Sequence, residues 1–172
     1  MKLLILLVLL FLLYIFGLFD ILLFRNYKRY KYYNDAKQKS IEKNKKLLVV
    51  GCPNNGGISS KIGNFFNIYK CGDLTIDIEK CNCSNFEQND LYMSLKNKKN
   101  NEYVIFISVT LEYIKDIEKV IKEIERVSGG DIYIVNIDIP IENLGLNLGK
   151  YNKFTRYWKI SIDNNKIIYK SI

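Results

Sequence analysis

The chain contains no histidine. Imidazole is the usual base of Ser-His-Asp and Cys-His sites and a common zinc ligand, so its absence excludes those mechanisms and every HExxH site. The four cysteines include no repeated C-x2-C pair, which is the usual spacing of a zinc knuckle, and we expect no metal site. The 172 residues, 48% of them hydrophobic, are enough for one folded domain with an appendage.

The net charge of +8 is unevenly distributed along the chain. Residues 1–46 contain ten basic and three acidic side chains, whereas residues 47–172 contain 16 basic and 15 acidic ones. A nucleic-acid-binding domain carries its own basic patch, and the nearly neutral region 47–172 has no strong basic excess. We therefore expect no nucleic-acid partner.

Residues 3–24 form an apolar run that carries a single charge, Asp20. As a helix these 22 residues would be about 33 Å long, which is enough to cross a hydrocarbon core of about 30 Å. The run continues to large residues instead of ending in the small-residue cleavage site of a signal peptide. We predict an uncleaved transmembrane anchor at residues 1–24.

A basic segment rich in tyrosine, residues 25–46, follows the predicted span. Six basic residues lie within about 15 residues after the span and only Lys2 lies before it, so the positive-inside rule predicts a single-pass protein with a cytoplasmic C-terminal domain. We interpret residues 25–46 as a juxtamembrane linker whose basic and aromatic side chains contact membrane lipid. The alternatives are a topology signal with a solvated linker, and nucleic-acid contact.

The cysteines fit a cytosolic domain, where Cys52, Cys71, Cys81 and Cys83 would be free thiols. Outside the cell the same even number could form two bridges. The sequon Asn82-Cys83-Ser84 provides a test, because glycosylation at Asn82 would show that the domain is lumenal.

Residues 47–172 alternate between strand and helix patterns. Apolar β-prone runs at 47–50, 74–78, 103–108 and 132–137 predict strands, and 58–66 predicts a short helix. Residues 80–102 are polar, with one helical turn expected around 91–95. The clearest helix is 116–127, with apolar residues at helical spacing, Asp116 as its N-cap and Gly129-Gly130 as its stop. The runs 157–162 and 166–171 predict a hairpin. We therefore predict an α/β fold: a Rossmann-like, mainly parallel open sheet with a C-terminal antiparallel hairpin, which binds ligands at the carboxyl ends of its strands.

The loop GCPNNGG at 51–57 matches neither common phosphate motif. Gly57 stands where a P-loop needs lysine, and Pro53 stands where G-x-G-x-x-G needs its second glycine. From these residues alone, the loop is either a turn or a cofactor loop.

Several segments together resemble class I S-adenosylmethionine-dependent methyltransferases. LLVVGCPNNGG is similar to their first strand and glycine loop, LTIDIEKC to their second strand, and SVTLEYIKDIEKVIKEIERVSGGDIYIV at 108–135 to the stretch from the fourth to the fifth strand. The chain is also similar to short methyltransferase-like proteins of large DNA viruses.

The resemblance implies a set of cofactor contacts. S-adenosylmethionine would be the cofactor; Asp77 would bind its ribose hydroxyls and Asp90 would approach its adenine. The remaining implied contacts are Gly51, Gly56, Gly57 and Ser108. The chain departs from the pattern at Val49, Pro53 and Tyr113, and in the short stretch between Asp77 and Asp90. These departures remove ligand contacts while they spare the core pattern.

Two functions follow from the resemblance. One is an active, membrane-anchored methyltransferase, because methyl transfer depends on binding and orientation and needs no histidine. The other is an inactive scaffold or interaction module with the same fold, tethered to the membrane. No catalytic residue, methyl acceptor or oligomeric state is predicted.

Overall fold

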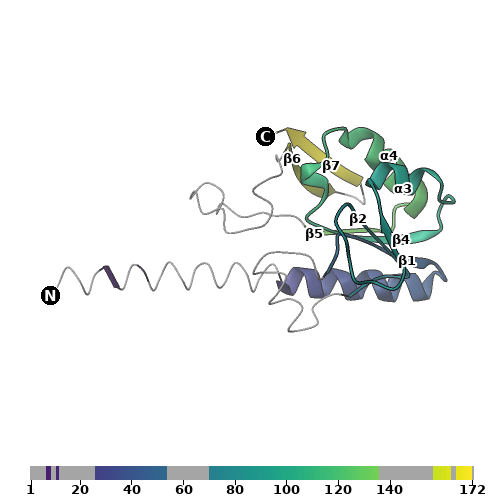
Figure 1. Ribbon diagram of the computed structural model, residues 1–172, viewed down its shortest axis with the longest axis horizontal. Helices are drawn as coiled ribbons and strands as arrows, with labels where there is room; N and C mark the ends of the chain where they lie inside the picture. The colour runs from purple at the N-terminus through teal and green to yellow at the C-terminus, as the bar shows by residue number, and fades with distance from the viewer. Residues whose placement is uncertain are drawn as a thin grey trace.

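A parallel sheet of five strands forms the centre of the computed structural model, which describes residues 7, 8, 11, 26–53, 70–135, 157–163 and 166–171 (Figure 1). The strands are β1 (Lys46–Val50), β2 (Leu74–Asp77), β3 (Phe86–Gln88), β4 (Tyr103–Ser108) and β5 (Ile132–Val135). Their order is β3-β2-β1-β4-β5, and each neighbouring pair is parallel. The predicted α/β fold is confirmed, and the order is compatible with a Rossmann-like sheet.

Burial explains the central strands. All six residues of β4 are buried, and the last four of β1 are buried beside it, with Leu48 paired with Ile105. Such continuous apolar runs are typical of strands covered on both faces. β3 was not predicted, because its sequence Phe-Glu-Gln contains no apolar run; its strand conformation depends on backbone pairing with β2.

Two helices cover one face of the sheet, α3 (Leu91–Lys96) and α4 (Ile117–Ser128) (Figure 1). The predicted helix is confirmed in α4, whose buried residues recur at helical spacing from Ile117 to Val127. Asp116 occupies the N-cap position without a side-chain capping bond, and Gly129 ends the helix in the left-handed conformation at φ 63°. The helical turn expected around 91–95 is α3, and Asp90 is its N-cap. The helix predicted at 58–66 lies outside the described residues.

The other face of the sheet is covered by a helix at residues 26–42, within the segment that we interpreted as a linker (Figure 1). Tyr33 and Ala36 pack with the strand residues Val49, Val104 and Phe106. The Tyr33 ring meets the Phe106 ring edge-on at 5.6 Å, and the Tyr33 hydroxyl donates to the carbonyl of Cys71 at 3.3 Å. The helix thus supplies half of the cover that a two-faced sheet requires, which argues against the alternative of a solvated linker for this part of the segment.

The basic residues at the end of this segment also have partners in the fold. Lys43 and Lys45 each approach a carboxylate oxygen of Asp131 at 2.6 Å, and Lys46 contacts Glu102 at 2.9 Å. Part of the N-terminal basic excess therefore neutralises acids of the α/β domain.

Acid is expected to weaken the contact around Asp131. Partial burial raises the pKa of the Asp131 carboxyl, but hydrogen bonds from Lys43 and Lys45 outweigh it, so the pKa lies below its ordinary value. A depressed pKa means that the contribution to stability is present above pH about 4 and is lost as the pH falls further. Urea unfolding at pH 7 and pH 3 should show a smaller loss in Asp131→Asn than in the parent chain. Equal losses in the two proteins would contradict this assignment.

The C-terminal hairpin consists of β6 (Trp158–Asp163) and β7 (Lys166–Ser171), which pair antiparallel as predicted. Among the described residues the hairpin forms a two-stranded sheet of its own, separate from the five-stranded sheet. Ile160 and Ile167 join the core on the α4 side, and the Trp158 indole donates to the carbonyl of Ile114 at 2.8 Å. Side-chain packing thus holds the hairpin against the domain.

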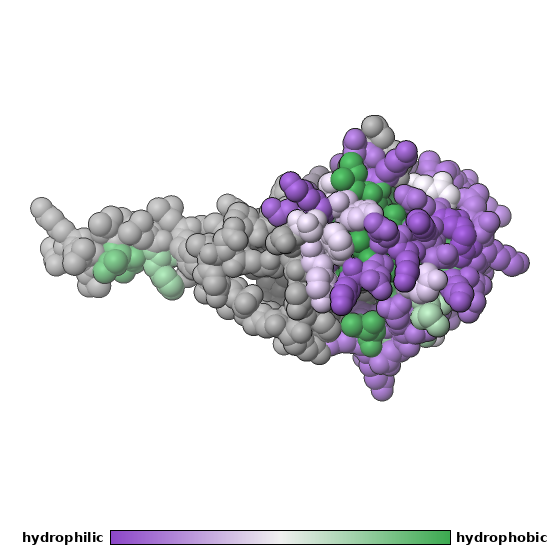
Figure 2. Space-filling view, turned by 90° about the horizontal axis from the view of Figure 1, so that it is seen from above, coloured by the Kyte–Doolittle hydropathy of each residue, from purple (hydrophilic) through white to green (hydrophobic). Residues whose placement is uncertain are grey.

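The predicted span lies mostly outside the described residues. In the part of the chain that the structure describes, no helix combines the length and apolar composition needed to cross a membrane. The three described residues of this segment, Leu7, Val8 and Phe11, are helical and exposed. In Figure 2 the visible face of the α/β domain is mainly hydrophilic, with small scattered hydrophobic groups.

Candidate functional site

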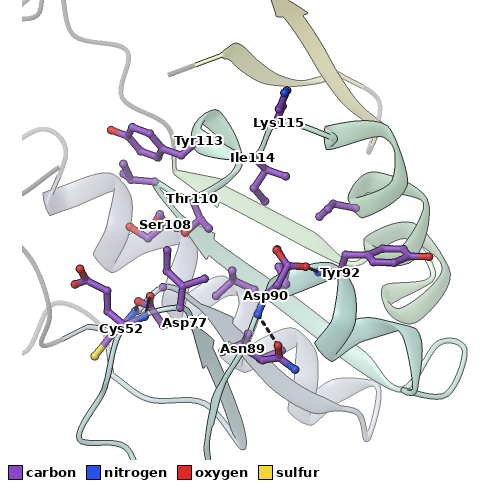
Figure 3. Close-up of a pocket in the computed structure, with 18 of the residues that line it drawn as sticks. Cys52, Asp77, Asn89, Asp90, Tyr92, Ser108, Thr110, Tyr113, Ile114 and Lys115 are labelled. Carbon is purple, nitrogen blue, oxygen red and sulfur yellow. Dashed lines mark hydrogen bonds between the residues drawn. The ribbon is translucent and has the colours of Figure 1, made fainter. Parts of the chain in front are cut away.

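A pocket of about 430 Å³ lies at the carboxyl edge of the parallel sheet. β1 stands between β2 and β4, so the chain leaves β1 towards one side and later returns on the other; open sheets bind ligands at such a switch point. The volume is within the usual range for small-molecule sites. Of the residues that sequence analysis assigned to the cofactor, Gly51, Asp77, Asp90 and Ser108 all line this pocket (Figure 3). Gly56 and Gly57 lie outside the described residues.

The pocket wall contains two backbone positions with positive φ. Gly51 has a φ of 95°, and a Cβ atom there would lie 3.0 Å from the carbonyl oxygen of Ser108. Val109 has a φ of 52°, which is unusual for a β-branched residue, and its N–H donates to the carbonyl of Val135 at 2.9 Å. Both chain turns therefore follow directly after central strands, and they shape the pocket between β1 and β4.

Asp77 connects the end of β2 to the loop after β1. One of its carboxylate oxygens accepts a hydrogen bond from the N–H of Cys52 at 2.6 Å, and the other accepts from the N–H of Glu79 at 2.9 Å. These bonds hold the first residues of the glycine loop in place. A carboxylate has about four lone-pair sites, so each oxygen keeps capacity for a ligand hydroxyl.

Asp90 also lines the pocket and lies shortly after the end of β3 (Figure 3). Its side chain caps α3 by accepting from the N–H groups of Tyr92, at 2.9 Å, and Met93, at 3.3 Å. The carboxylate is exposed, so capping leaves it open to further contacts. The arrangement explains Asp90 as a helix cap and also allows the adenine contact that the resemblance implies.

Arg29 is a pocket residue that sequence analysis assigned to the juxtamembrane linker. Its side chain is buried, and its Nε donates to the hydroxyl of Ser108 at 3.0 Å, so the helix at 26–42 brings a positive charge to the end of β4. Asp77, Glu79 and Asp90 contribute negative charge elsewhere in the same pocket. A ligand that carries both an anionic group and hydroxyl or amino groups would match this distribution.

The structure pairs all four cysteines, so the expectation of free thiols is wrong. The disulfides are Cys52–Cys81 and Cys71–Cys83, with Cα atoms 5.7 and 5.8 Å apart. Cys52 and Cys81 follow the neighbouring strands β1 and β2, and Cys71 and Cys83 precede the neighbouring strands β2 and β3. Strand pairing thus decides which cysteines meet. The first bridge attaches the glycine loop to the connection after β2 and so supports the pocket wall.

Comparisons of the chain with known proteins leave the family open. No model of a known protein family matches the chain, and no curated protein or solved structure matches it either. The parallel sheet and its edge pocket are compatible with a Rossmann-like ligand-binding fold. They do not by themselves identify a methyltransferase.

Proposed function

We propose that the α/β domain binds S-adenosylmethionine in the pocket at the carboxyl edge of the sheet, as a membrane-tethered methyltransferase-like protein. The observation that carries the proposal is the common pocket of Gly51, Asp77, Asp90 and Ser108, residues from four separate segments. The motif resemblance selected these residues for the same ligand.

Each pocket residue would contact a different part of the cofactor. Asp77 would accept hydrogen bonds from the ribose hydroxyls, Asp90 would lie near the adenine, and Gly51 would allow close approach to the backbone. The buried Arg29 guanidinium would pair with the carboxylate of the methionine part. When bound, the cofactor supplies an electrophilic methyl group; the domain's contribution would be to orient it.

The tether belongs to the same proposal. Residues 3–24 would cross the membrane, and the exposed tyrosines Tyr27 and Tyr30 would lie at its interface, where such amphipathic rings are favoured. Tyr33 has no such role, because its ring is part of the core.

A specific observation favours the alternative function, an inactive scaffold. Both oxygens of Asp77 already bind backbone N–H groups, and Cys52 is covalently attached to Cys81. These contacts give Asp77 a structural purpose without any ligand. In this alternative the same fold serves protein interaction.

Calorimetry of the full chain with S-adenosylmethionine tests the proposal. We expect saturable binding that weakens about tenfold in Asp90→Asn, a loss of about 1.4 kcal/mol. This substitution removes the charge but keeps the helix cap, since asparagine caps as well as aspartate. Asp163→Asn, on the exposed hairpin, should bind like the parent. Absence of binding at millimolar cofactor in a folded sample would exclude the proposal and leave the scaffold.

A further inference from the structure

The sequence Asn82-Cys83-Ser84 is the only Asn-x-Ser/Thr sequon among the 172 residues. It lies in the connection between β2 and β3, where Asn82 is exposed. Asn82 does not line the pocket, so a sugar attached to it would leave the pocket accessible. Position and exposure therefore suit a glycan acceptor on a surface loop.

The cysteines on each side of Asn82 belong to the two disulfides. Cys81 pairs with Cys52 and Cys83 pairs with Cys71, and the sulfurs of Cys81 and Cys83 lie 3.4 Å apart. Two disulfides that include all four cysteines of the chain are typical of a domain that folds in an oxidising compartment, because the cytosol keeps thiols reduced. This is the compartment in which sequons are glycosylated.

Arg29, one of the six basic residues that predicted a cytoplasmic domain, has a second explanation in the fold, as do Lys43 and Lys45 further along the segment. Arg29 is buried against Ser108, and Lys43 and Lys45 form ion pairs with Asp131. The fold thus requires positive charge at these positions whatever the side of the membrane. The value of Arg29 as a topology signal is correspondingly reduced.

From these observations we propose that the α/β domain lies on the lumenal or outer side of its membrane and carries an N-linked glycan at Asn82. The predicted span would then act as a signal anchor, with its amino terminus in the cytoplasm. This proposal reverses the orientation expected from the basic segment and does not depend on cofactor binding.

Expression of the full chain in cultured eukaryotic cells tests this orientation. We expect a band on a denaturing gel that moves faster after treatment with peptide N-glycosidase. Asn82→Gln and Ser84→Ala should each lack this shift, whereas Ser84→Thr, which preserves the sequon, should retain it. The serine variants separate loss of the sequon from loss of the fold, because Ser84 is exposed in the connection between β2 and β3.

Two further readouts distinguish the sides directly. In sealed microsomes the domain should resist added protease until detergent is present, and its four cysteines should react with maleimide only after reduction. A protected domain without a glycan would overturn the modification site. Digestion in intact microsomes, with thiols that react before reduction, would overturn the entire proposal.

Discussion

Replacement of Cys52 and Cys81 by serine is expected to lower the free energy of unfolding by about 3.6 kcal/mol. The bridge closes a loop of 29 residues, and the chain-entropy relation gives about this value for a loop of that length. The substitution also releases the glycine loop from the connection after β2. Urea unfolding of the full chain in detergent, under non-reducing conditions, measures the change.

The other disulfide provides the matched control. Cys71→Ser with Cys83→Ser opens a loop of 12 residues, for which the same relation gives about 2.8 kcal/mol. Cys52 lines the pocket and Cys71 does not. Loss of the Cys52–Cys81 bridge should therefore lower the affinity for a cofactor more than loss of the Cys71–Cys83 bridge. Double variants as stable as the parent would show that the cysteines are not bridged in the folded protein.

Arg126→Ala is expected to destabilise the domain by about 2–3 kcal/mol. The guanidinium of Arg126, on α4, donates to the carbonyl of Leu95 at 2.9 Å and to that of Lys98 at 2.8 Å, at the end of α3. It also contacts Glu123 at 2.6 Å on its own helix. Each hydrogen bond from a charged donor contributes about 1.5–3 kcal/mol to stability. Solvent screening reduces this contribution here, because the Arg126 side chain is partly exposed.

Arg126→Lys is the control for this clamp between α3 and α4. A lysine keeps the charge but cannot bind both carbonyls in the fixed fork of a guanidinium, so we expect an intermediate loss of stability. Thermal unfolding of the three proteins should rank parent, lysine and alanine in this order. A lysine variant as unstable as alanine would indicate that both carbonyls must be bound at once, whereas an unaffected alanine variant would refute the clamp.

The results for cofactor binding and for glycosylation must be interpreted together. A glycosylated domain that binds S-adenosylmethionine would require the cofactor on the lumenal or outer side. A glycosylated domain with no affinity for it would favour the interaction module. The glycan and the calorimetric result are measured independently, so failure of one proposal is distinguishable from failure of the other.

Strands and helices with strong apolar patterns were predictable from the sequence. β4 is a run of six buried residues, and α4 repeats apolar residues at helical spacing, so local pattern and final burial agree. The helix at 26–42 was missed for the opposite reason. Its five buried positions recur at helical spacing, but three of them, Asn26, Arg29 and Ser40, are polar, and only Tyr33 and Ala36 are hydrophobic. A hydrophobicity pattern does not detect a face of this composition.

The candidate site was only partly predictable. Parallel strands end at one edge, so Gly51, Asp77 and Ser108 could be expected together from the strand assignments alone. Arg29 could not, because the sequence separates it from Ser108 by 79 positions and only helix packing brings the two together.

By itself, the sequence determined the α/β class, the central strands and the carboxyl edge at which a pocket could form, because these depend on local periodicity and on the direction of parallel strands. Tertiary structure decided the cysteine pairing, the placement of the hairpin and the use of the basic segment as cover for the sheet. Each of these depends on which segments become neighbours. Pairing of β1 with β2 brings Cys52 to Cys81, and packing of one helix against the sheet brings Arg29 to Ser108.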